Sequence, residues 1–262
     1  MSDLITYELE AEEKSTEREE ILKTAMAKTE SQHRFMSILG HDLRNPLNTI
    51  LVASTLQQQE NTSEPERIEL AEKITRAVRR MQFLINDLLD TTQIVRGGDF
   101  SIEKKSISLR EVCAMVVEEF KIANPVRKIE FYAEDECLGQ WDEGRLGQVL
   151  SNLVSNALNY GRRDAPVKVN LIGEPELVVL QVNNQGNLIT EEVRKNLFQP
   201  FWRGSKNNES KSNSGGLGLG LYIVKQIVEA HKGEVSVESN RDYGTTFTVK
   251  FPREAGDCTH NQ

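Results

Sequence analysis

The chain has 262 residues, enough for about two domains, and its 38% hydrophobic and 27% charged residues suit globular domains with proper cores. No apolar run approaches the ~20 residues of a membrane-spanning helix, and no signal for export is recognisable. A net charge of −8 argues against nucleic-acid binding, because an acidic surface repels phosphates. Cys113, Cys137 and Cys258 are odd in number and lack CxxC spacing, so we expect neither pairing nor zinc and a reducing, cytoplasmic location.

The first 30 residues hold nine acids and four bases. Beyond an acidic stretch, five positions recur at alternating spacings of four and three, although two of them are polar. They are Leu22, Met26, Thr29, His33 and Met36. Two interpretations stay open: a solvated single helix, or a coiled-coil lead-in to a dimer.

The helical pattern continues into a predicted hairpin. Its first helix carries Leu39, Leu43, Leu47 and Ile50. A break follows at 61–65, where Ser63 can cap and Pro65 can begin a second helix, which Gly97-Gly98 ends. The second helix has the clearest apolar stripe: Ile74, Val78, Met81, Ile85, Leu88, Thr92 and Val95. Because a hairpin cannot cover this seam alone, two copies are expected to form a dimeric four-helix bundle.

After residue 100 the composition changes to strands mixed with helices. The predicted strands are Lys128–Tyr132, Val167–Ile172, Leu177–Val182, Glu234–Glu238 and Thr245–Phe251. The predicted helices are Leu109–Phe120, Arg145–Leu158 and Leu219–Ala230. This order indicates a two-layer α/β domain. The polar run Gly204–Gly216 has no apolar residue and is expected to be a mobile loop.

One histidine stands out on the first helix of the hairpin. His41 lies two positions from an apolar residue on either side, so it should point away from the seam. Neutral imidazole is a competent nucleophile near physiological pH. Asp42 can hold the proton on one ring nitrogen, and Asn45, one turn later, can position a water. Pro46 should bend the helix just beyond the histidine.

The run Phe35–Ile50, FMSILGHDLRNPLNTI, resembles the phosphoacceptor box of sensor histidine kinases. The resemblance implies that His41 is the residue phosphorylated and that Asp42 is its acid/base helper. Asn45 occupies the position linked in that family to dephosphorylation of the partner protein.

A second group of polar residues lies on the predicted helix Arg145–Leu158. Gln148, Asn152, Asn156 and Asn159 form a ridge, which by spacing alone is an ordinary solvated face. Amide oxygens nevertheless suit Mg²⁺ beside phosphates. The string NLVSNALNYG resembles the asparagine box of the same kinases, which implies Asn156 as the Mg²⁺ ligand, Asn152 near metal and phosphates, and Tyr160 against adenine. Related ATPases carry a glutamate where Asn152 stands, so hydrolysis for its own sake is disfavoured.

A glycine-rich turn, Gly215–Tyr222, follows the polar loop and precedes a helix, an arrangement that lets the backbone approach phosphates. It resembles the second glycine box of these kinases, which assigns Gly216, Gly218 and Gly220 to the nucleotide. Phe198–Gly204 resembles their phenylalanine box and implies that Arg203 contacts the γ-phosphate, although its aromatic residues also suit a core.

The first glycine box departs from the family pattern. In the run 182–189, Asn184 replaces the usual aspartate that accepts from the adenine amino group, and Leu188 replaces a glycine. Asn159 stands where a basic residue often meets phosphate. These departures affect nucleotide affinity without removing the site. Gly186 in this box and Thr245 in the last one, GTTF, are assigned near the nucleotide.

The sequence thus predicts an α+β chain: an antiparallel hairpin in a dimeric four-helix bundle, followed by a two-layer ATP-binding sandwich of the histidine kinase, chaperone and topoisomerase type. The expected parts are a lead-in (1–30), a phosphoacceptor hairpin (31–97), a catalytic domain (98–253) and a tail (254–262). With ATP and Mg²⁺, the chain is expected to phosphorylate His41 and pass the group to a response-regulator receiver domain, under an upstream sensory domain or sensor protein. A weakened kinase serving as a scaffold and an ATPase of the same fold remain as alternatives.

Overall fold

The computed structural model describes residues 39–40, 42–59, 63–95, 102–202 and 217–253, with no side chains described for 91–95. The chain divides into two compact units that meet within one long helix, between Gln82 and Phe83. Each unit is described by itself. Among the described residues, no helix combines the length and the apolar character needed to cross a membrane.

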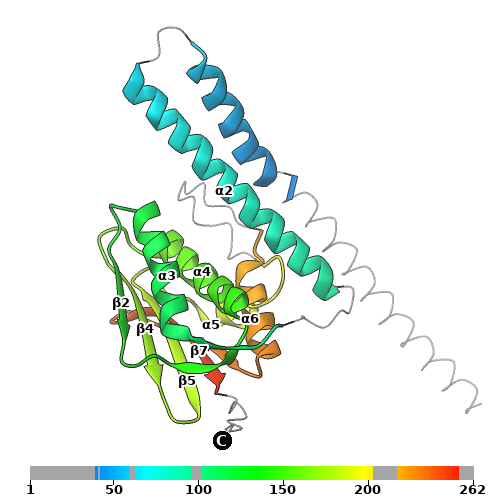
Figure 1. Cartoon of the computed structure of the whole chain (residues 1–262), viewed down its shortest axis with the longest axis vertical. Coiled ribbons are helices and arrows are strands. Elements are labelled where there is room, and N and C mark those ends of the chain that lie inside the picture. Colours follow the sequence, from blue (N-terminus) through cyan, green and yellow to red (C-terminus); the bar gives the residue numbers. More distant parts are fainter. Residues whose placement is uncertain (1–38, 41, 60–62, 96–101, 203–216, 254–262) are drawn as a thin grey trace, which may run out of the picture. The chain divides into compact units, whose positions relative to one another are not determined.

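The first unit contains most of the predicted helical hairpin, whose second helix continues into the second unit (Figure 1). Its first helix includes residues 42–57, and α2 spans Glu64–Val95, so α2 begins one residue before Pro65. The backbone N–H of Ser63 donates to Glu66 Oε2 at 2.9 Å and its hydroxyl donates to the same oxygen at 2.7 Å. This serine–glutamate pair resembles half of a capping box and accounts for the start of α2.

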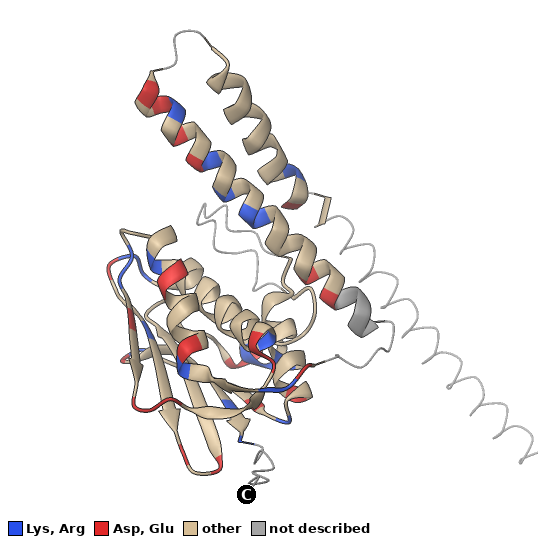
Figure 2. Cartoon of the chain, viewed as in Figure 1, with Lys and Arg blue, Asp and Glu red and all other residues tan. Residues whose placement is uncertain are grey.

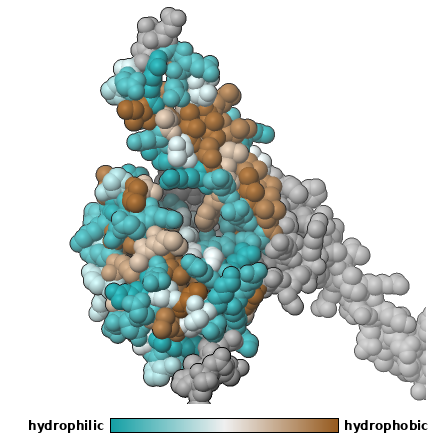
Figure 3. All heavy atoms as spheres, viewed as in Figure 1, coloured by the Kyte–Doolittle hydropathy of each residue, from teal (hydrophilic) through white to brown (hydrophobic). Residues whose placement is uncertain are grey.

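The hairpin buries few of its apolar side chains. Ala53, Leu70 and Ala77 are buried, whereas Val78 on the predicted stripe is 41% exposed and its neighbours Ile74 and Met81 are half-buried. Figure 3 shows apolar side chains gathered on the visible face of the helices. Among the described residues of the hairpin, the exposed large apolar ones are Leu47, Leu51, Val52, Leu56, Ile68, Val78, Phe83, Ile85 and Leu89. A single chain therefore leaves much of the predicted seam uncovered.

In contrast to this apolar face, another side of α2 carries charged residues of both signs (Figure 2). Lys73 Nζ lies 2.7 Å from Glu69, and Arg76 lies 3.1 Å from Glu72, both at i,i+4 spacing. Such exposed pairs add a few tenths of a kcal/mol each to helix stability. The lead-in before residue 39, the side chains of Thr92 and Val95, and the Gly97-Gly98 hinge lie outside the described residues.

The second unit is a two-layer sandwich. Its five-stranded sheet has the order β2-β4-β5-β7-β6, in which only β2 and β4 are parallel. Its strands are β2 (Ile129–Ala133), β4 (Val167–Gly173), β5 (Leu177–Asn184), β6 (Glu234–Asn240) and β7 (Gly244–Pro252). Three helices, α3 (Leu109–Ala123), α4 (Glu143–Tyr160) and α6 (Gly220–Ala230), pack on one face of this sheet (Figure 1).

Alternation along the strands produces the core of this sandwich. Every second residue of β4 and β7 is buried, as expected for a sheet covered on one face. All five predicted strands and three predicted helices are confirmed to within a few residues. The sequence reasoning missed a two-stranded sheet of β1 (Lys105–Ser108) and β3 (Leu138–Trp141) and the short helix α5 (Glu191–Asn196).

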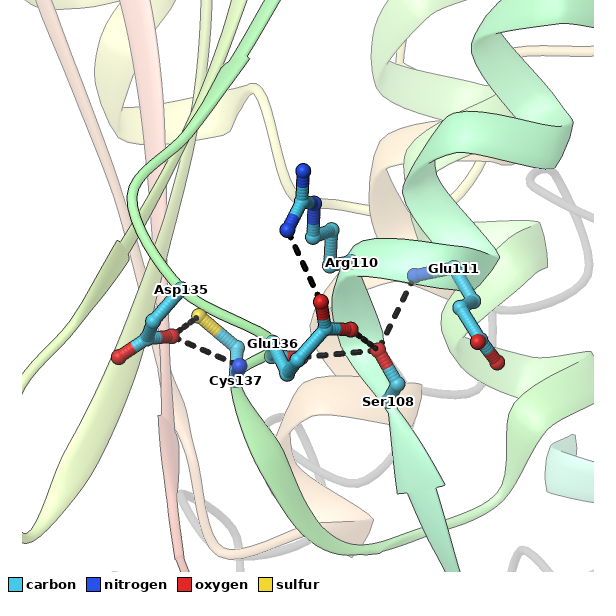
Figure 4. Close-up of polar contacts among 6 residues, drawn as sticks. All are labelled: Ser108, Arg110, Glu111, Asp135, Glu136 and Cys137. Atoms are coloured by element: carbon cyan, nitrogen blue, oxygen red, sulfur yellow. Dashed lines mark hydrogen bonds and ion pairs between the residues drawn. The ribbon is translucent and has the colours of Figure 1, made fainter.

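The corner between β1 and α3 is fixed by polar contacts (Figure 4). The Ser108 hydroxyl caps α3 by accepting from the Glu111 N–H at 3.3 Å, and it donates to the Glu136 carbonyl at 2.9 Å. Cys137 adopts a positive φ of 49°, held by its N–H and its thiol, which both donate to Asp135 Oδ1 at 2.7 Å. Cys113 and Cys137 are free and buried, and burial raises the pKa of each thiol to about 12. Both thiols are therefore held in the unreactive neutral form.

Candidate nucleotide-binding site

The candidate phosphoacceptor residues lie on the first helix. His41 lies outside the described residues. Asp42 is buried at 2% exposure, Asn45 is exposed, and Pro46 is buried within an uninterrupted helix. The carboxyl group beside the predicted nucleophile is thus shielded from solvent, whereas Asn45 faces it.

Helix α4 carries the candidate metal and phosphate ligands. Its apolar residues pack into the core between α3 and α6, and Asp142 caps its start by accepting from the Arg145 N–H at 3.1 Å. Asn152 lies only 5% exposed, and its Nδ2 has no hydrogen-bond partner among the described residues. Asn156 is half-buried and Asn159 is exposed. The interpretation of the ridge as a solvated face is wrong at Asn152, where a buried amide is left with a free donor.

The glycine-rich turn meets Asn152 at the start of α6. Leu217 and Leu219 are buried and anchor the turn, while Gly218 between them has a φ of 70°. Gly220 begins α6, and a Cβ placed on it would lie 3.1 Å from Asn152 Oδ1. The lack of a side chain at Gly220 therefore lets the start of α6 approach the Asn152 amide closely, where a larger residue would crowd it.

A second cluster forms where α4 ends. Gly161 and Gly186 form an isolated bridge, and a Cβ on either glycine would lie 3.2 Å from an atom of the Asn184 side chain. Asn184 is 5% exposed at the end of β5, and its backbone pairs with Thr245 of β7. The ring-bearing side chain of Tyr160, just before Gly161, is 71% exposed. The structure thus groups Asn184, Gly186 and Thr245, with Tyr160 beside them.

Thr245 is buried at the other side of this cluster. Its hydroxyl lies 2.8 Å from the Ser239 hydroxyl on β6, and Ser239 also accepts from the Ile189 N–H at 3.1 Å. The neighbouring Asn183 donates to the Thr246 hydroxyl at 2.8 Å. Asn183 and Ser239 were not anticipated as candidates, and no sequence signal distinguished them from ordinary strand residues.

Two predicted nucleotide contacts, Arg203 and Gly216, lie outside the described residues, as does the polar loop Gly204–Gly216. Within the described part of the chain, Asn152, Gly218 and Gly220 form one group. Asn184, Gly186 and Thr245 form the other, at the carboxyl end of the same helix α4. The departures Leu188 and Asn159 are both exposed, so neither fills space inside the site.

Gln148, the first residue of the predicted ridge, belongs to a different cluster. It donates to Asp90 Oδ2 at 2.6 Å, and Arg145 donates to Asp90 Oδ1 at 2.8 Å. Burial, and then the charge of Asp90, raises the pKa of Asp87 to about 7. The sequence reasoning missed these two acids, because both lie on a helix where only the apolar stripe was followed.

The donor set fits Mg·ATP. Amide oxygens on Asn152 and Asn156 are hard ligands of the kind that Mg²⁺ accepts, and the unsatisfied Nδ2 of Asn152 offers a donor to a phosphate oxygen. Glycines at 218 and 220 let backbone N–H groups at the start of α6 approach an anion. Asn184 offers a carbonyl acceptor at the other end of α4.

Two family models match the chain. Residues 31–97 match the His Kinase A (phospho-acceptor) domain, and residues 141–255 match the histidine kinase-, DNA gyrase B-, and HSP90-like ATPase. Together they cover more than two thirds of the chain. The first includes the hairpin and the second includes both groups of candidate nucleotide ligands.

Two curated proteins are similar to most of this chain. The chain is 34% identical over 221 residues to a bacteriophytochrome of Pseudomonas aeruginosa, covering 84% of this chain and 30% of that protein. It is 29% identical over 272 residues to the autoinducer 2 sensor kinase/phosphatase LuxQ of Vibrio vulnificus, covering 97% of this chain and 30% of that protein. The chain therefore spans less than a third of the length of either relative.

A solved structure shows the same sandwich. The nucleotide-free catalytic domain of the histidine kinase ThkA superposes with a TM-score of 0.51 at 28% identity, over 58% of this chain and 98% of that domain. The hairpin falls in the region of the first family model, and the elements from α4 to β7 fall in the region of the second. The chain belongs to the sensor histidine kinase family.

Proposed function

We propose that this chain is the core of an ATP-dependent protein-histidine kinase that phosphorylates His41 and passes the phosphoryl group to an aspartate of a response regulator. The observation that carries the proposal is the buried Asn152 amide, which has a free donor beside the Gly218–Gly220 turn. This arrangement lies in the region that matches the ATPase model, and His41 lies in the region that matches the phosphoacceptor model.

In this proposal Asn156 holds Mg²⁺, and Asn152 with the glycines Gly216, Gly218 and Gly220 contacts the phosphates. The adenine group lies near Asn184, Gly186, Thr245 and Tyr160, and Arg203 steadies the γ-phosphate. The support is that the described members of this set form two groups along α4, one at Asn152 in its middle and one beside its C-terminal end. Mg·ATP supplies the activated phosphoryl group.

The transfer itself needs little side-chain chemistry beyond positioning. A neutral ring nitrogen of His41 forms the new N–P bond, the bond between the γ-phosphorus and its bridging oxygen breaks, and ADP leaves with the electron pair. In this proposal the second ring nitrogen then carries a proton that Asp42, the next residue in the chain, accepts or holds. The buried position of Asp42 supports this role, because a carboxylate shielded from water interacts more strongly with a nearby charge.

The wider organisation follows from the same proposal. We assign 1–30 as a helical lead-in, 31–97 as the dimerisation and phosphoacceptor hairpin, 98–253 as the catalytic domain and 254–262 as a tail. The apolar side chains left exposed on the hairpin support a homodimer. Free cysteines support a cytoplasmic location, and the relatives' greater length supports an upstream sensory part.

The test is phosphorylation of the wild type beside His41→Gln with γ-labelled ATP. The wild type should take up acid-labile, base-stable label, His41→Gln should take up none, and the matched control His33→Gln should retain it. Label on His41→Gln would overturn the assignment. Phosphate release without protein labelling would favour the ATPase alternative, and nucleotide binding with neither activity would favour the scaffold.

A reverse activity on the response regulator is supported by one position. Asn45 is exposed on the helix that carries the phosphoacceptor motif, where it can reach a docked partner. The relative LuxQ is named as a kinase/phosphatase. Asn45→Ala should therefore slow loss of label from a phosphorylated regulator while leaving autophosphorylation of His41 in place.

A further inference from the structure

His231 lies at the C-terminal end of α6, and it is 1% exposed. Its Nδ1 lies 2.8 Å from the Ile227 carbonyl, one turn earlier on the same helix. Its Nε2 accepts from the backbone N–H of Asp142 at 3.1 Å, across a gap of 89 residues in sequence. The ring also packs edge-on against Phe251 of β7, with centroids 6.0 Å apart and an interplanar angle of 79°.

These two hydrogen bonds define the state of the imidazole. A carbonyl oxygen only accepts, so Nδ1 carries the hydrogen, and a backbone N–H only donates, so Nε2 must present its lone pair. The ring is therefore the neutral Nδ1–H tautomer. No other residue type offers a donor and an acceptor at these two positions on one rigid ring, which is why a histidine serves here.

The partner residue Asp142 is itself the cap of α4. Its Oδ1 accepts from the Arg145 N–H at 3.1 Å, and its Oδ2 accepts from the Glu103 N–H at 2.9 Å. The bond from His231 thus joins the last turn of α6 directly to the first turn of α4. The glycine-rich turn precedes the first of these helices, and Asn152 and Asn156 lie on the second.

The two helices run in opposite directions. At one end His231 meets Asp142, and at the other a Cβ on Gly220 would lie 3.1 Å from Asn152 Oδ1. Both contacts are separated by ten or eleven residues along their helices, which is about 15 Å at 1.5 Å per residue. A helix behaves as a rigid rod over this length, so a slip at the His231 end moves the Gly220 end by a similar amount.

We propose that His231 is a positioning residue for the nucleotide site: it fixes the axial register of α6 against α4 and so sets where Gly220, at the start of α6, lies against the Asn152 amide. This inference rests on the proposed function, because that function assigns Asn152 and the start of α6 to the nucleotide. His231 does not touch the ligand, and it acts through the backbone of Asp142.

Two substitutions at His231 test the roles of its two ring nitrogens separately. His231→Gln keeps an acceptor at about the reach of Nε2, whereas His231→Asn keeps a donor near the position of Nδ1 and loses the bond to Asp142. Ile129→Val on the edge strand β2 is the matched stability control, because it trims a buried side chain that belongs to neither helix. Removing one buried methylene costs a comparable amount of stability.

The experiment measures binding of Mg·ADP to the full chain by calorimetry, together with hydrogen exchange of the Asp142 amide. His231→Asn should weaken nucleotide binding about three- to tenfold and speed exchange at Asp142. His231→Gln should bind within about twofold of wild type, as should Ile129→Val. In labelling assays, His231→Asn should raise the KM for ATP and leave kcat nearly unchanged.

The outcomes are distinguishable. If the Asn and Gln variants lose stability equally and bind nucleotide as wild type does, His231 is only structural and the inference is overturned. If the wild type itself fails to bind Mg·ADP, the proposed function fails and this inference fails with it. Selective loss in His231→Asn supports both.

Discussion

The hairpin and the sandwich differ in how completely they bury their apolar side chains. In the sandwich, alternating strand residues and three amphipathic helices close a core in which Val149, Leu150 and Leu153 are fully buried. In the hairpin, Ala53, Leu70 and Ala77 are buried, while larger apolar residues stay exposed. The sandwich therefore closes its core within one chain, whereas the hairpin leaves apolar side chains exposed, which under the proposed function a second copy covers. The candidate functional residues are divided in the same way, with the proposed nucleotide ligands in the sandwich and the region matching the phosphoacceptor model in the hairpin.

The largest effect on this contrast is expected at Gly244, the first residue of β7, where the chain turns from β6. Its φ is 78°, and a Cβ there would lie 2.3 Å from the Asn184 carbonyl oxygen and 2.9 Å from the Gln185 Cα. Gly244→Ala adds backbone overlap to backbone strain and should destabilise the sandwich by at least about 3 kcal/mol. Urea denaturation should show the sandwich transition shifted and the hairpin transition unchanged.

The matched control is another glycine-to-alanine change in the same unit. A Cβ on Gly144, in the first turn of α4, would meet only Asp142 Oδ1 at 3.6 Å. Gly144→Ala should be neutral or slightly stabilising, since alanine favours helix by up to about 1 kcal/mol. Equal stability of both variants would contradict the account of the β6–β7 turn.

The next effect is expected in the hairpin. Val78→Glu places a charge on the predicted seam, where covering it would cost several kcal/mol. The dimer dissociation constant should rise about a hundredfold by sedimentation equilibrium, while Mg·ADP binding by the sandwich stays unchanged. Arg79→Glu introduces the same side chain at the adjacent exposed position outside the stripe and should leave association nearly intact. A Val78→Glu chain that dimerises as wild type would show that another face carries the contact.

The same contrast explains what the sequence predicts well. The β-rich runs of the sequence coincide with all five strands of the large sheet, and β4 and β7 show the alternating burial that a sheet covered on one face imposes. The heptad stripe found α2, although the face buried within one chain runs through Leu70 and Ala77 rather than through Val78. A single sequence does not distinguish the face buried within a chain from the face buried between chains.

Other features carry too little local signal to be predicted. Strands β1 and β3 are four residues each and are held by pairing across 30 or more residues of sequence. The Asn152 amide appeared solvated by spacing alone, because its burial comes from α6 packing against it. The bond from His231 to Asp142 likewise joins residues that no periodicity connects.

The smallest effect concerns the start of α2, where sequence and structure agree closely. Ser63→Ala removes the hydroxyl that donates to Glu66, and the hairpin melting temperature should fall by about 4 °C. The Ser63 hydroxyl and then its backbone N–H lower the pKa of Glu66, so this contact stabilises the fold above the usual glutamate range and is lost as the pH falls through the lowered pKa. The difference between variant and wild type should therefore shrink in acid.

Thr75→Ala on the same helix is the control for this change. Its hydroxyl donates to the Ala71 carbonyl at 2.9 Å in the middle of α2, where the backbone bond already exists and alanine is the better helix former. Thermal melts of the full chain should show no loss for Thr75→Ala at any pH. A loss as large as that of Ser63→Ala would mean that hydroxyl contacts along α2 are equivalent, and that the cap has no special role in beginning the second helix. A loss confined to Ser63→Ala, and only above the Glu66 titration, instead ties the start of α2 to one ionised carboxylate.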